Sequence, residues 1–162
     1  MSAQKLIDEL QLAAHPEGGY YRETYRSPET IMTNEGRRNL STAIYYLLEN
    51  EQKSLFHRIK SDELWFFHQG ATLEIVLIRD NSIQTILLGN NIEKGETLQA
   101  VIPADTWFAA MIKNLSGYAL VSCTVAPGFN FLDFELAKKE DLLEQFPQLK
   151  DHIEIFTLQV KI

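Results

Sequence analysis

The sequence predicts an all-β fold, an antiparallel sandwich or barrel, with short helices near its two ends. From residue 20 to residue 126, short runs of β-branched, aromatic and aliphatic residues are separated by turn-forming residues. Some runs alternate clearly, as where Leu73, Ile75 and Leu77 occupy one face of a strand. A chain of 162 residues is expected to form a single domain over residues 1–162, built around one main core.

Two helices and a terminal strand are expected around these runs. Residues 3–10 place apolar side chains at helical spacing, and Ser2 is suited to cap that helix. A second short helix around residues 142–146 ends at Pro147, which a helix interior does not tolerate. Residues 151–162 are expected to form a strand-like tail, because apolar and polar residues alternate from Phe156 to Ile162.

The first strand, Tyr20 to Ser27, mixes aromatic and charged residues on both faces, with Tyr21, Glu23 and Tyr25 sharing one of them. Such a strand is expected to line a polar cavity or an interface, although an exposed strand has a similar composition. Residues 28–39 are expected to form a polar loop, long enough for a lid or an interface arm. The other strands are expected at residues 42–48, 72–79, 83–88, 97–102, 107–112 and 118–125, with a consecutive pair between residues 54 and 70.

Charge and cysteine content argue against several classes of protein. The net charge is −7, and no basic stripe gathers the 15 Lys and Arg, which argues against nucleic-acid binding. No apolar run approaches the ~20 residues that span a bilayer, and the N-terminus lacks the apolar core of a signal peptide. The single cysteine, Cys123, lies in an apolar strand and cannot form an internal disulfide, which fits a reducing compartment. We therefore expect a cytoplasmic protein that contacts neither nucleic acid nor membrane.

Residues 54–70 concentrate the side chains that carry chemistry. His57 lies in the middle of an apolar strand face, and Glu63 shares the apolar face of the following strand with Trp65. A titratable group on an apolar face costs free energy unless it has a partner. If the two strands pair, His57 and Glu63 point into the same interior and form a candidate catalytic pair. In the alternative, His57 only packs and Glu63 belongs to a half-exposed strand.

Several blocks of the sequence together resemble one family. In order, they are residues 15–27 (HPEGGYYRETYRS), 56–58 with 61–65 (FHR and SDELW), 101–104 (VIPA), 125–129 (VAPGF) and 133–136 (DFEL). In content and order they resemble the cupin superfamily and, within it, the family called DUF985 or Cupin_5. The resemblance covers about residues 3–150 and leaves the tail 151–162 outside. It implies a cupin double-stranded β-helix, a jelly-roll barrel whose interior holds the ligand.

The cupin metal motif is incomplete in this chain. Its first half has the form G-x5-H-x-H-x3-4-E-x6-G, in which His57 and Glu63 match but Ile59 stands at the second histidine. In the second half, Phe108 stands where the third histidine belongs. Transition metals in such sites need several nitrogen or oxygen ligands, which isoleucine and phenylalanine do not offer. We therefore expect no metal cofactor; the alternative is that Glu23 or His68 replaces a missing ligand, although His68 falls on the opposite face of a regular strand from Glu63.

The leading expectation is a small-molecule-binding cupin of unassigned substrate. His57 and Glu63 are its candidate catalytic residues, and the resemblance is compatible with a sugar-like or nucleotide-like ligand. The expected ligand-binding residues are aromatic and charged side chains near the barrel mouth: Tyr21, Arg22, Glu23, Tyr25, Trp65, Trp107 and Phe108.

Two other functions are compatible with the same residues. Metal-free sugar-nucleotide epimerases, another cupin branch, have a G-x-F-x-E strand similar to residues 19–23, and their general base falls at His57. The chain departs from them at Glu63, where their catalytic lysine lies, and at Val121, where their acid tyrosine lies. Without that lysine an enolate lacks its stabilising cation. The third function is a structural or interaction barrel whose aromatic interior is only a core.

Two further expectations concern pairing. Inside an apolar barrel without a metal, Glu63 needs a donor, and His57 is the nearest candidate in the sequence. The strand Tyr20–Ser27 and the alternating tail near Phe156 leave sheet edges to protect. We therefore expect a homodimer in which one of these segments crosses to the partner.

Overall fold

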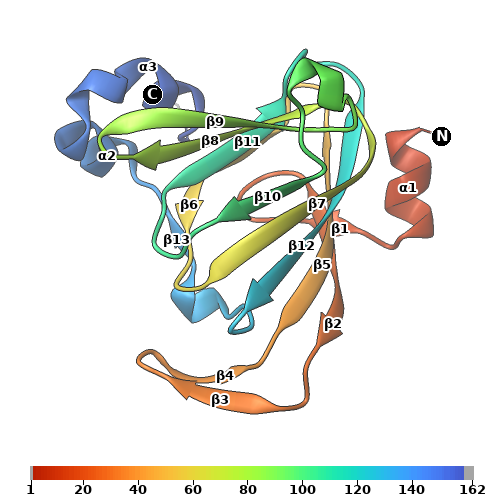
Figure 1. Cartoon of the computed structure of the whole chain (residues 1–162), viewed down its shortest axis with the longest axis vertical. Helices are drawn as coiled ribbons and strands as arrows, with labels where there is room; N and C mark the ends of the chain where they lie inside the picture. Colours follow the sequence, from red (N-terminus) through yellow and green to blue (C-terminus); the bar gives the residue numbers. More distant parts are fainter. Residues whose placement is uncertain (1, 159–162) are drawn as a thin grey trace.

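Two antiparallel sheets face each other and form a barrel (Figure 1). The computed structural model describes residues 2–158. The six-stranded sheet has the order β1 (Ala13–Ala14), β2 (Tyr20–Arg26), β5 (Thr42–Glu49), β12 (Tyr118–Ala126), β7 (Asp62–Gly70), β10 (Gln99–Ile102). The five-stranded sheet has the order β13 (Glu135–Leu136), β6 (Lys53–Arg58), β11 (Phe108–Ile112), β8 (Leu73–Arg79), β9 (Ser82–Leu88). The predicted all-β jelly roll with short helices near its ends is confirmed.

The main core lies between the sheets. Tyr46 and Trp65 from the six-stranded sheet pack near Phe108 from the five-stranded sheet, and none of the three is more than 1% exposed. The alternating face of β8 also points into this core, as its sequence pattern predicted. Because one end of the barrel interior is filled by these large side chains, open space is confined to the other end.

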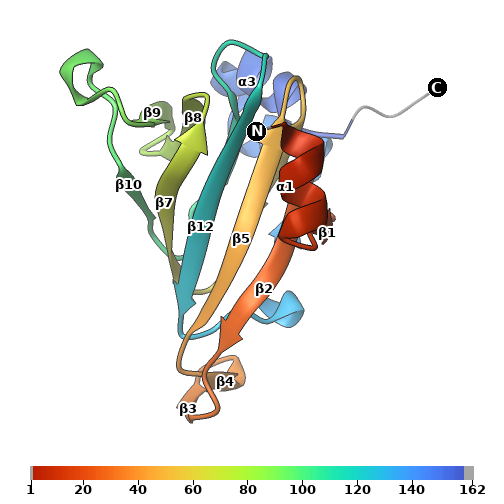
Figure 2. The ribbon, with the colours of Figure 1, turned by 90° about the vertical axis from the view of Figure 1, so that its right-hand side faces the viewer.

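Short helices cover the outer faces of both sheets. Helix α1 (Ala3–Glu9) lies against the six-stranded sheet, as Figure 2 shows, and its buried Leu6 and Ile7 pack there. Its N-terminus is capped as predicted, since the Ser2 hydroxyl accepts a hydrogen bond from the Lys5 N–H. Helices α2 (Lys139–Gln145) and α3 (Lys150–Ile155) cover the five-stranded sheet, with the 3-10 turn η3 (Pro147–Leu149) between them (Figure 1). Within residues 2–158, no helix is long and apolar enough to cross a membrane.

The prediction of a strand-like tail is wrong where the structure describes it. Residues 150–155 are helical, and the segment after them packs Phe156 against Phe56. Leu149 and Ile153 are spaced four residues apart, which is a helical period, and both pack in the same cluster. The alternation from Phe156 onward concealed this shorter helical pattern. Residues 159–162 lie outside the described residues, so the remainder of the predicted tail is untested.

The segment predicted as a polar loop, residues 28–39, is a β-hairpin. Its strands are β3 (Thr30–Thr33) and β4 (Gly36–Asn39), and they form a separate two-stranded sheet. The Thr33 hydroxyl accepts from the Glu35 N–H and donates to the Gly36 carbonyl, which stabilises a tight turn. Polar side chains in both strands made the hairpin resemble a loop in the sequence.

The two strands that carry His57 and Glu63 do not pair with each other. β6 pairs with β11 and β13 in one sheet, whereas β7 pairs with β10 and β12 in the other. Residues 59–61 therefore cross from one sheet to the other. As a result, His57 and Glu63 still face one interior, but from opposite walls of the barrel.

Candidate functional site

A cavity of about 650 Å³ occupies the open end of the barrel. Strands of both sheets line it, together with residues 13–17 ahead of β2. The crossing segment, defined as residues 127–134, runs from β12 in one sheet to β13 in the other and includes the 3-10 turn η2 (Phe131–Asp133) (Figure 1). It contributes an aromatic wall to the cavity: Phe129, Phe131 and Phe134.

His57 is held on both sides of its ring. Its Nδ1 lies 2.7 Å from the Leu55 carbonyl oxygen, and its Nε2 lies 2.9 Å from the Glu17 carboxylate. The other Glu17 oxygen accepts from the Ser54 hydroxyl at 2.8 Å. A carbonyl oxygen only accepts, so Nδ1 carries a proton, and an ionised Glu17 requires a second proton on Nε2. The geometry is that of an imidazolium–carboxylate pair.

The pKa directions of His57 and Glu17 agree with this assignment. Burial lowers the pKa of His57, but the charge and hydrogen bond of Glu17 outweigh burial and raise the pKa above its ordinary value. Burial raises the pKa of Glu17, but His57 outweighs it and the pKa falls below its ordinary value. Each shift favours the charged form of its group, in agreement with the geometry.

The loop of residues 15–19 brings Glu17 to this position. The Leu55 N–H donates to the Glu17 carbonyl at 2.9 Å, which joins the loop to β6. Gly18 has φ +109°, and a Cβ there would lie 2.0 Å from the Lys53 carbonyl oxygen. Only glycine allows the chain to pass this close to β6.

His15 is the second histidine of the cavity, and it is neutral. Its Nδ1 accepts a hydrogen bond from the Glu17 N–H at 3.2 Å, so its proton is on Nε2. Burial is the largest influence and lowers the pKa of His15. The ring packs at 4.5 Å between centroids on Tyr21 and lies near Phe131 and Phe134.

Glu63 lines the opposite wall and has a different environment. It is 7% exposed and makes no hydrogen bond of ordinary length among the described residues. Burial raises its pKa to about 7; the charge of His57 and the nearby Trp65 and Cys123 side chains lower it only in part. The indole N–H of Trp65 is itself buried without a hydrogen-bond partner within residues 2–158. Glu63 is thus a carboxyl group that exchanges its proton near neutral pH.

An arginine–glutamate pair lies at the rim of the cavity. Arg26 binds Glu23 through two hydrogen bonds of 2.9 and 2.7 Å and also donates to the carbonyl of Phe129 and to Asn39. A bulge in β2 after Glu23 turns Arg26, rather than Tyr25, to the cavity side, where Arg26 pairs in register with Thr42.

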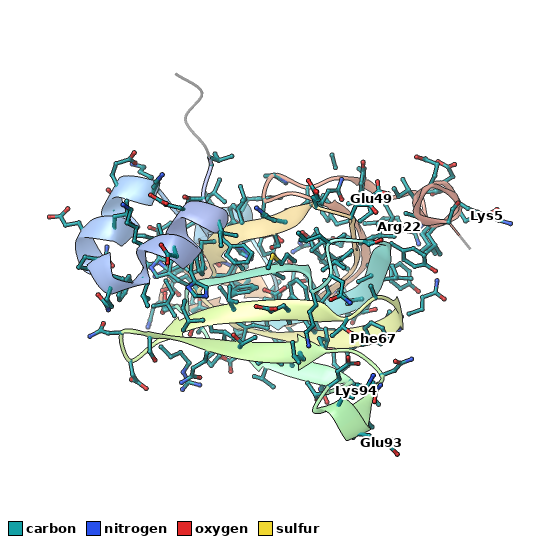
Figure 3. The ribbon with its side chains drawn as sticks, turned by 90° about the horizontal axis from the view of Figure 1, so that it is seen from above. Lys5, Arg22, Glu49, Phe67, Glu93 and Lys94 are labelled. Atoms are coloured by element: carbon teal, nitrogen blue, oxygen red, sulfur yellow. The ribbon has the colours of Figure 1, made fainter. Side chains whose placement is uncertain are left out.

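The predicted ligand-binding residues separate into two groups. Tyr21, Arg22 and Glu23 line the cavity with the predicted catalytic residues. Arg22 lies at its margin, because its register partner is Tyr45 on the outer face, and Figure 3 places it on the side of the barrel that α1 covers. The remaining residues of the prediction do not line the cavity: Tyr25, Trp65, Trp107 and Phe108.

Each of the four residues outside the lining has a physical reason for its position. Tyr25 is 53% exposed because the bulge turns it outward. Trp65 and Phe108 are buried in the core behind the cavity, where the Phe108 ring supports His57 at 4.1 Å between centroids. Trp107 packs on the outer side of the five-stranded sheet, under the guanidinium of Arg58 at 4.4 Å.

Sequence reasoning missed His15, Glu17, Arg26 and the aromatic wall, and it assigned the wrong partner to His57. The predicted His57–Glu63 hydrogen bond is absent, because Glu17 occupies that side of the imidazole. One signal was available: Glu17 lies between Pro16 and two glycines, where a tight turn brings a carboxylate over neighbouring backbone. Nothing in the strand periodicity indicated which strand that turn approaches.

The donor set does not fit a cupin transition metal. Both nitrogens of His57 face acceptors already, and Ile59 lines the cavity where a second histidine would lie. Among the described residues, no three His, Cys, Asp or Glu side chains are grouped closely enough to bind a metal ion.

Two facing antiparallel sheets that close into a barrel form a jelly roll, the architecture to which cupins belong. Residues 4–137 match the family described as "Cupin superfamily (DUF985)", and the chain belongs to this family. It is 32% identical over 158 residues to the uncharacterized protein YML079W of Saccharomyces cerevisiae, covering 88% of this chain and 79% of the yeast protein.

Two solved structures are similar over nearly the whole length. A hypothetical protein from Leishmania major superposes with a TM-score of 0.92 at 36% identity, covering 98% of this chain and 100% of the other. Protein SO0799 from Shewanella oneidensis superposes with a TM-score of 0.91 at 37% identity, covering 98% of each chain. These two structures share the fold of this chain, and their descriptions name no substrate.

Proposed function

We propose that this cupin binds a small organic molecule in the cavity between its sheets. The observation that carries the proposal is Glu63, a buried carboxyl group that lines a cavity of about 650 Å³ and makes no hydrogen bond of ordinary length within residues 2–158. Leaving a buried polar group unpaired costs roughly 1–3 kcal/mol. A ligand that pairs with it recovers that free energy. The aromatic wall supplies apolar contact area for a ring, in keeping with the expected sugar-like or nucleotide-like ligand.

A metabolite screen by thermal shift, followed by native mass spectrometry of the hits, tests this proposal. A ligand at 100 times its dissociation constant stabilises the fold by about 2.7 kcal/mol. The variant Ile44→Phe enlarges a residue that lines the cavity and should abolish the shift. Leu98→Phe makes a similar change at an exposed site away from the cavity and should retain it. Ligands that raise the melting temperature of both variants equally would bind outside the cavity.

The same proposal includes binding without a metal. Elemental analysis of protein purified without chelators should find no stoichiometric transition metal, because His57 is engaged at both nitrogens and Ile59 stands where a second histidine would lie. About one metal per chain that disappears in His57→Ala would overturn this part.

The epimerase-like alternative has weaker support than ligand binding alone. A general base needs a free lone pair within reach of the substrate. His57 has none, since one nitrogen faces the Leu55 carbonyl and the other faces Glu17. A barrel with only a structural role is supported less than either, because an inert core would not retain an unpaired carboxyl group in open space.

We also propose a homodimer and a cytoplasmic location. β1 pairs with only Tyr20 and Tyr21, so the rest of β2 is an open edge that a second copy can cover. Light scattering at micromolar concentration decides the assembly. The location is supported by the single buried thiol of Cys123, and fractionation of cells tests it.

A further inference from the structure

Three acceptor side chains of the cavity, Glu17, Glu23 and Asn130, already accept hydrogen bonds within the chain. Glu17 accepts from Ser54 and His57 through its two oxygens, and Glu23 accepts from Arg26 through both of its own. The side-chain oxygen of Asn130 accepts from the Leu132 N–H. A ligand that needs acceptors, such as an ammonium group, finds few of them free.

Donors, in contrast, remain available. His15 is protonated on Nε2, and no described residue accepts from that nitrogen. Glu63 in its acid form carries a hydroxyl group with no acceptor of ordinary geometry. A neutral carboxyl group retained in an apolar site is a hydrogen-bond donor to a carbonyl oxygen.

The fixed charges inside the cavity form two pairs, and one further charged side chain, Arg22, lies at its margin. His57 pairs with Glu17, and Arg26 pairs with Glu23. When Glu63 is protonated, these side chains sum to no net charge. Beyond Arg22 at the margin, an anionic or cationic ligand therefore meets no unpaired counter-charge among these side chains and must lose its hydration on entry.

We propose that the ligand is an uncharged ring molecule that bears a hydrogen-bond acceptor, such as a cyclic or aromatic amide, ester or ketone. Glu63 and His15 donate to its acceptor, and the ring packs on the aromatic wall of Phe129, Phe131 and Phe134. This inference rests on the proposed function and names its ligand class: among sugar-like and nucleotide-like ligands it retains only those without charge.

The inference requires that ligand binding follow the protonation of Glu63. The groups that face Glu63 come from several elements: His57 on β6, Glu17 in the loop ahead of β2, Cys123 on β12, and Trp65 on its own strand. The two charges of His57 and Glu17 oppose each other, so burial remains the dominant influence. Below pH 7 the hydroxyl donor is present, and above it a carboxylate repels the carbonyl oxygen.

Three probes of nearly equal shape test the ligand class. Benzamide is neutral and bears a carbonyl acceptor, benzoate is an anion, and benzamidine is a cation. Each is titrated into the wild-type protein and followed by NMR chemical shifts of the backbone amides. At pH 6 benzamide should bind about tenfold more tightly than either charged probe, a difference of about 1.4 kcal/mol. The shifts should centre on the cavity lining. Tighter binding of benzoate or benzamidine, or no binding by benzamide, overturns the inference.

Variants of Glu63 test whether this residue donates a hydrogen bond to the ligand or is only a polar residue near it. From pH 6 to pH 8.5 the affinity of the wild type for benzamide should fall about 30-fold, in proportion to the protonated fraction. Glu63→Gln keeps an N–H donor at both pH values and should show no such fall, whereas Glu63→Leu should bind weakly at both. Equal pH dependence in wild type and Glu63→Gln contradicts the role of Glu63. The proposed function itself fails only if the metabolite screen also yields no ligand that depends on the cavity.

Discussion

The two walls of the cavity each hold a buried glutamate, and they shift its pKa in opposite directions. On the wall formed by β6 and the loop ahead of β2, Glu17 is buried and ionised, with a pKa below its ordinary value. On the wall formed by β7, Glu63 is equally buried, yet its pKa is about 7. Burial raises both, so burial does not explain the difference. Glu17 receives two hydrogen bonds, one of them from a cation, and Glu63 receives none of ordinary length from the residues that the structure describes.

The wall formed by β6 and the loop ahead of β2 is structural, whereas the wall formed by β7 is available to bind a ligand. A buried carboxylate with all its lone pairs engaged helps to hold one geometry. A buried carboxyl group without such hydrogen bonds lowers the stability of the fold but can still form hydrogen bonds with a ligand. Functional groups are often found in such destabilising environments.

The largest expected effect comes from breaking the paired wall. Glu17→Gln removes the carboxylate and leaves the imidazolium of His57 buried without its counter-charge. Loss of one partner of a buried pair typically costs about 3–5 kcal/mol, and we expect a loss in this range from urea unfolding at pH 6. The pKa of His57, followed by NMR, should fall. Glu63→Gln is the matched control, and a similar loss in both variants would contradict the difference between the walls.

The second prediction concerns the unpaired wall and has the opposite sign. The folded-state pKa of Glu63 is raised, so its contribution to stability is present below pH 4.5 and is lost as the pH rises through about 7. Glu63→Gln does not ionise and avoids this loss. The stability advantage of the variant over wild type should grow by about 3 kcal/mol between pH 4 and pH 8.5. Urea unfolding at several pH values measures it, and a difference that does not change with pH would refute the raised pKa.

The third prediction is that the crossing segment limits access from solvent to the cavity between the walls. Arg38 on the β3–β4 hairpin holds this segment through two hydrogen bonds of 2.6 Å to Asp133. Asp133→Asn weakens that attachment and should increase severalfold the rate at which iodoacetamide alkylates Cys123, the single thiol, which lines the cavity. Asp105→Asn makes the same change in an exposed pair with Lys60 and should have no effect on the rate. Equal rates in both variants would show that the attachment does not limit access.

The smallest effect is expected outside both walls. Tyr25→Ser changes an exposed residue that does not line the cavity. Stability should change by no more than about 0.5 kcal/mol, and the ligands found by thermal shift should bind unchanged. Loss of binding would mean that Tyr25 acts on the cavity in spite of its position.

Most of the fold was predictable because its signals are local. Strand alternation, as in β8, and the capping Ser2 depend on neighbours in the sequence. The hairpin at residues 30–39 and helix α3 were missed for a related reason. Their local patterns are ambiguous, and contacts with distant residues, such as Arg38 with Asp133 and Ile153 with the cluster on the five-stranded sheet, decide them.

The site was less predictable than the fold. His57 and Glu63 stood out as titratable residues on apolar strand faces, and both line the cavity. Their partners could not be read from that pattern, because the loop of residues 15–19 reaches β6 from more than thirty positions away in the sequence. The prediction that Tyr25 binds the ligand places it on the wrong face, because a bulge cannot be recognised from the composition of the strand.

That bulge makes the rim of the cavity depend on the length of β2 as well as on its residues. Between Glu23 and Arg26 the strand holds one residue more than its partner β5, and this extra residue brings the two side chains to one face. If β2 paired regularly with β5 over its present length, Glu23 and Arg26, three positions apart, would lie on opposite faces. The guanidinium would then point away from Glu23 and the Phe129 carbonyl, although every contacting residue would still be present. Relatives that share each of these side chains but pair these two strands without the bulge would therefore have a differently built entrance.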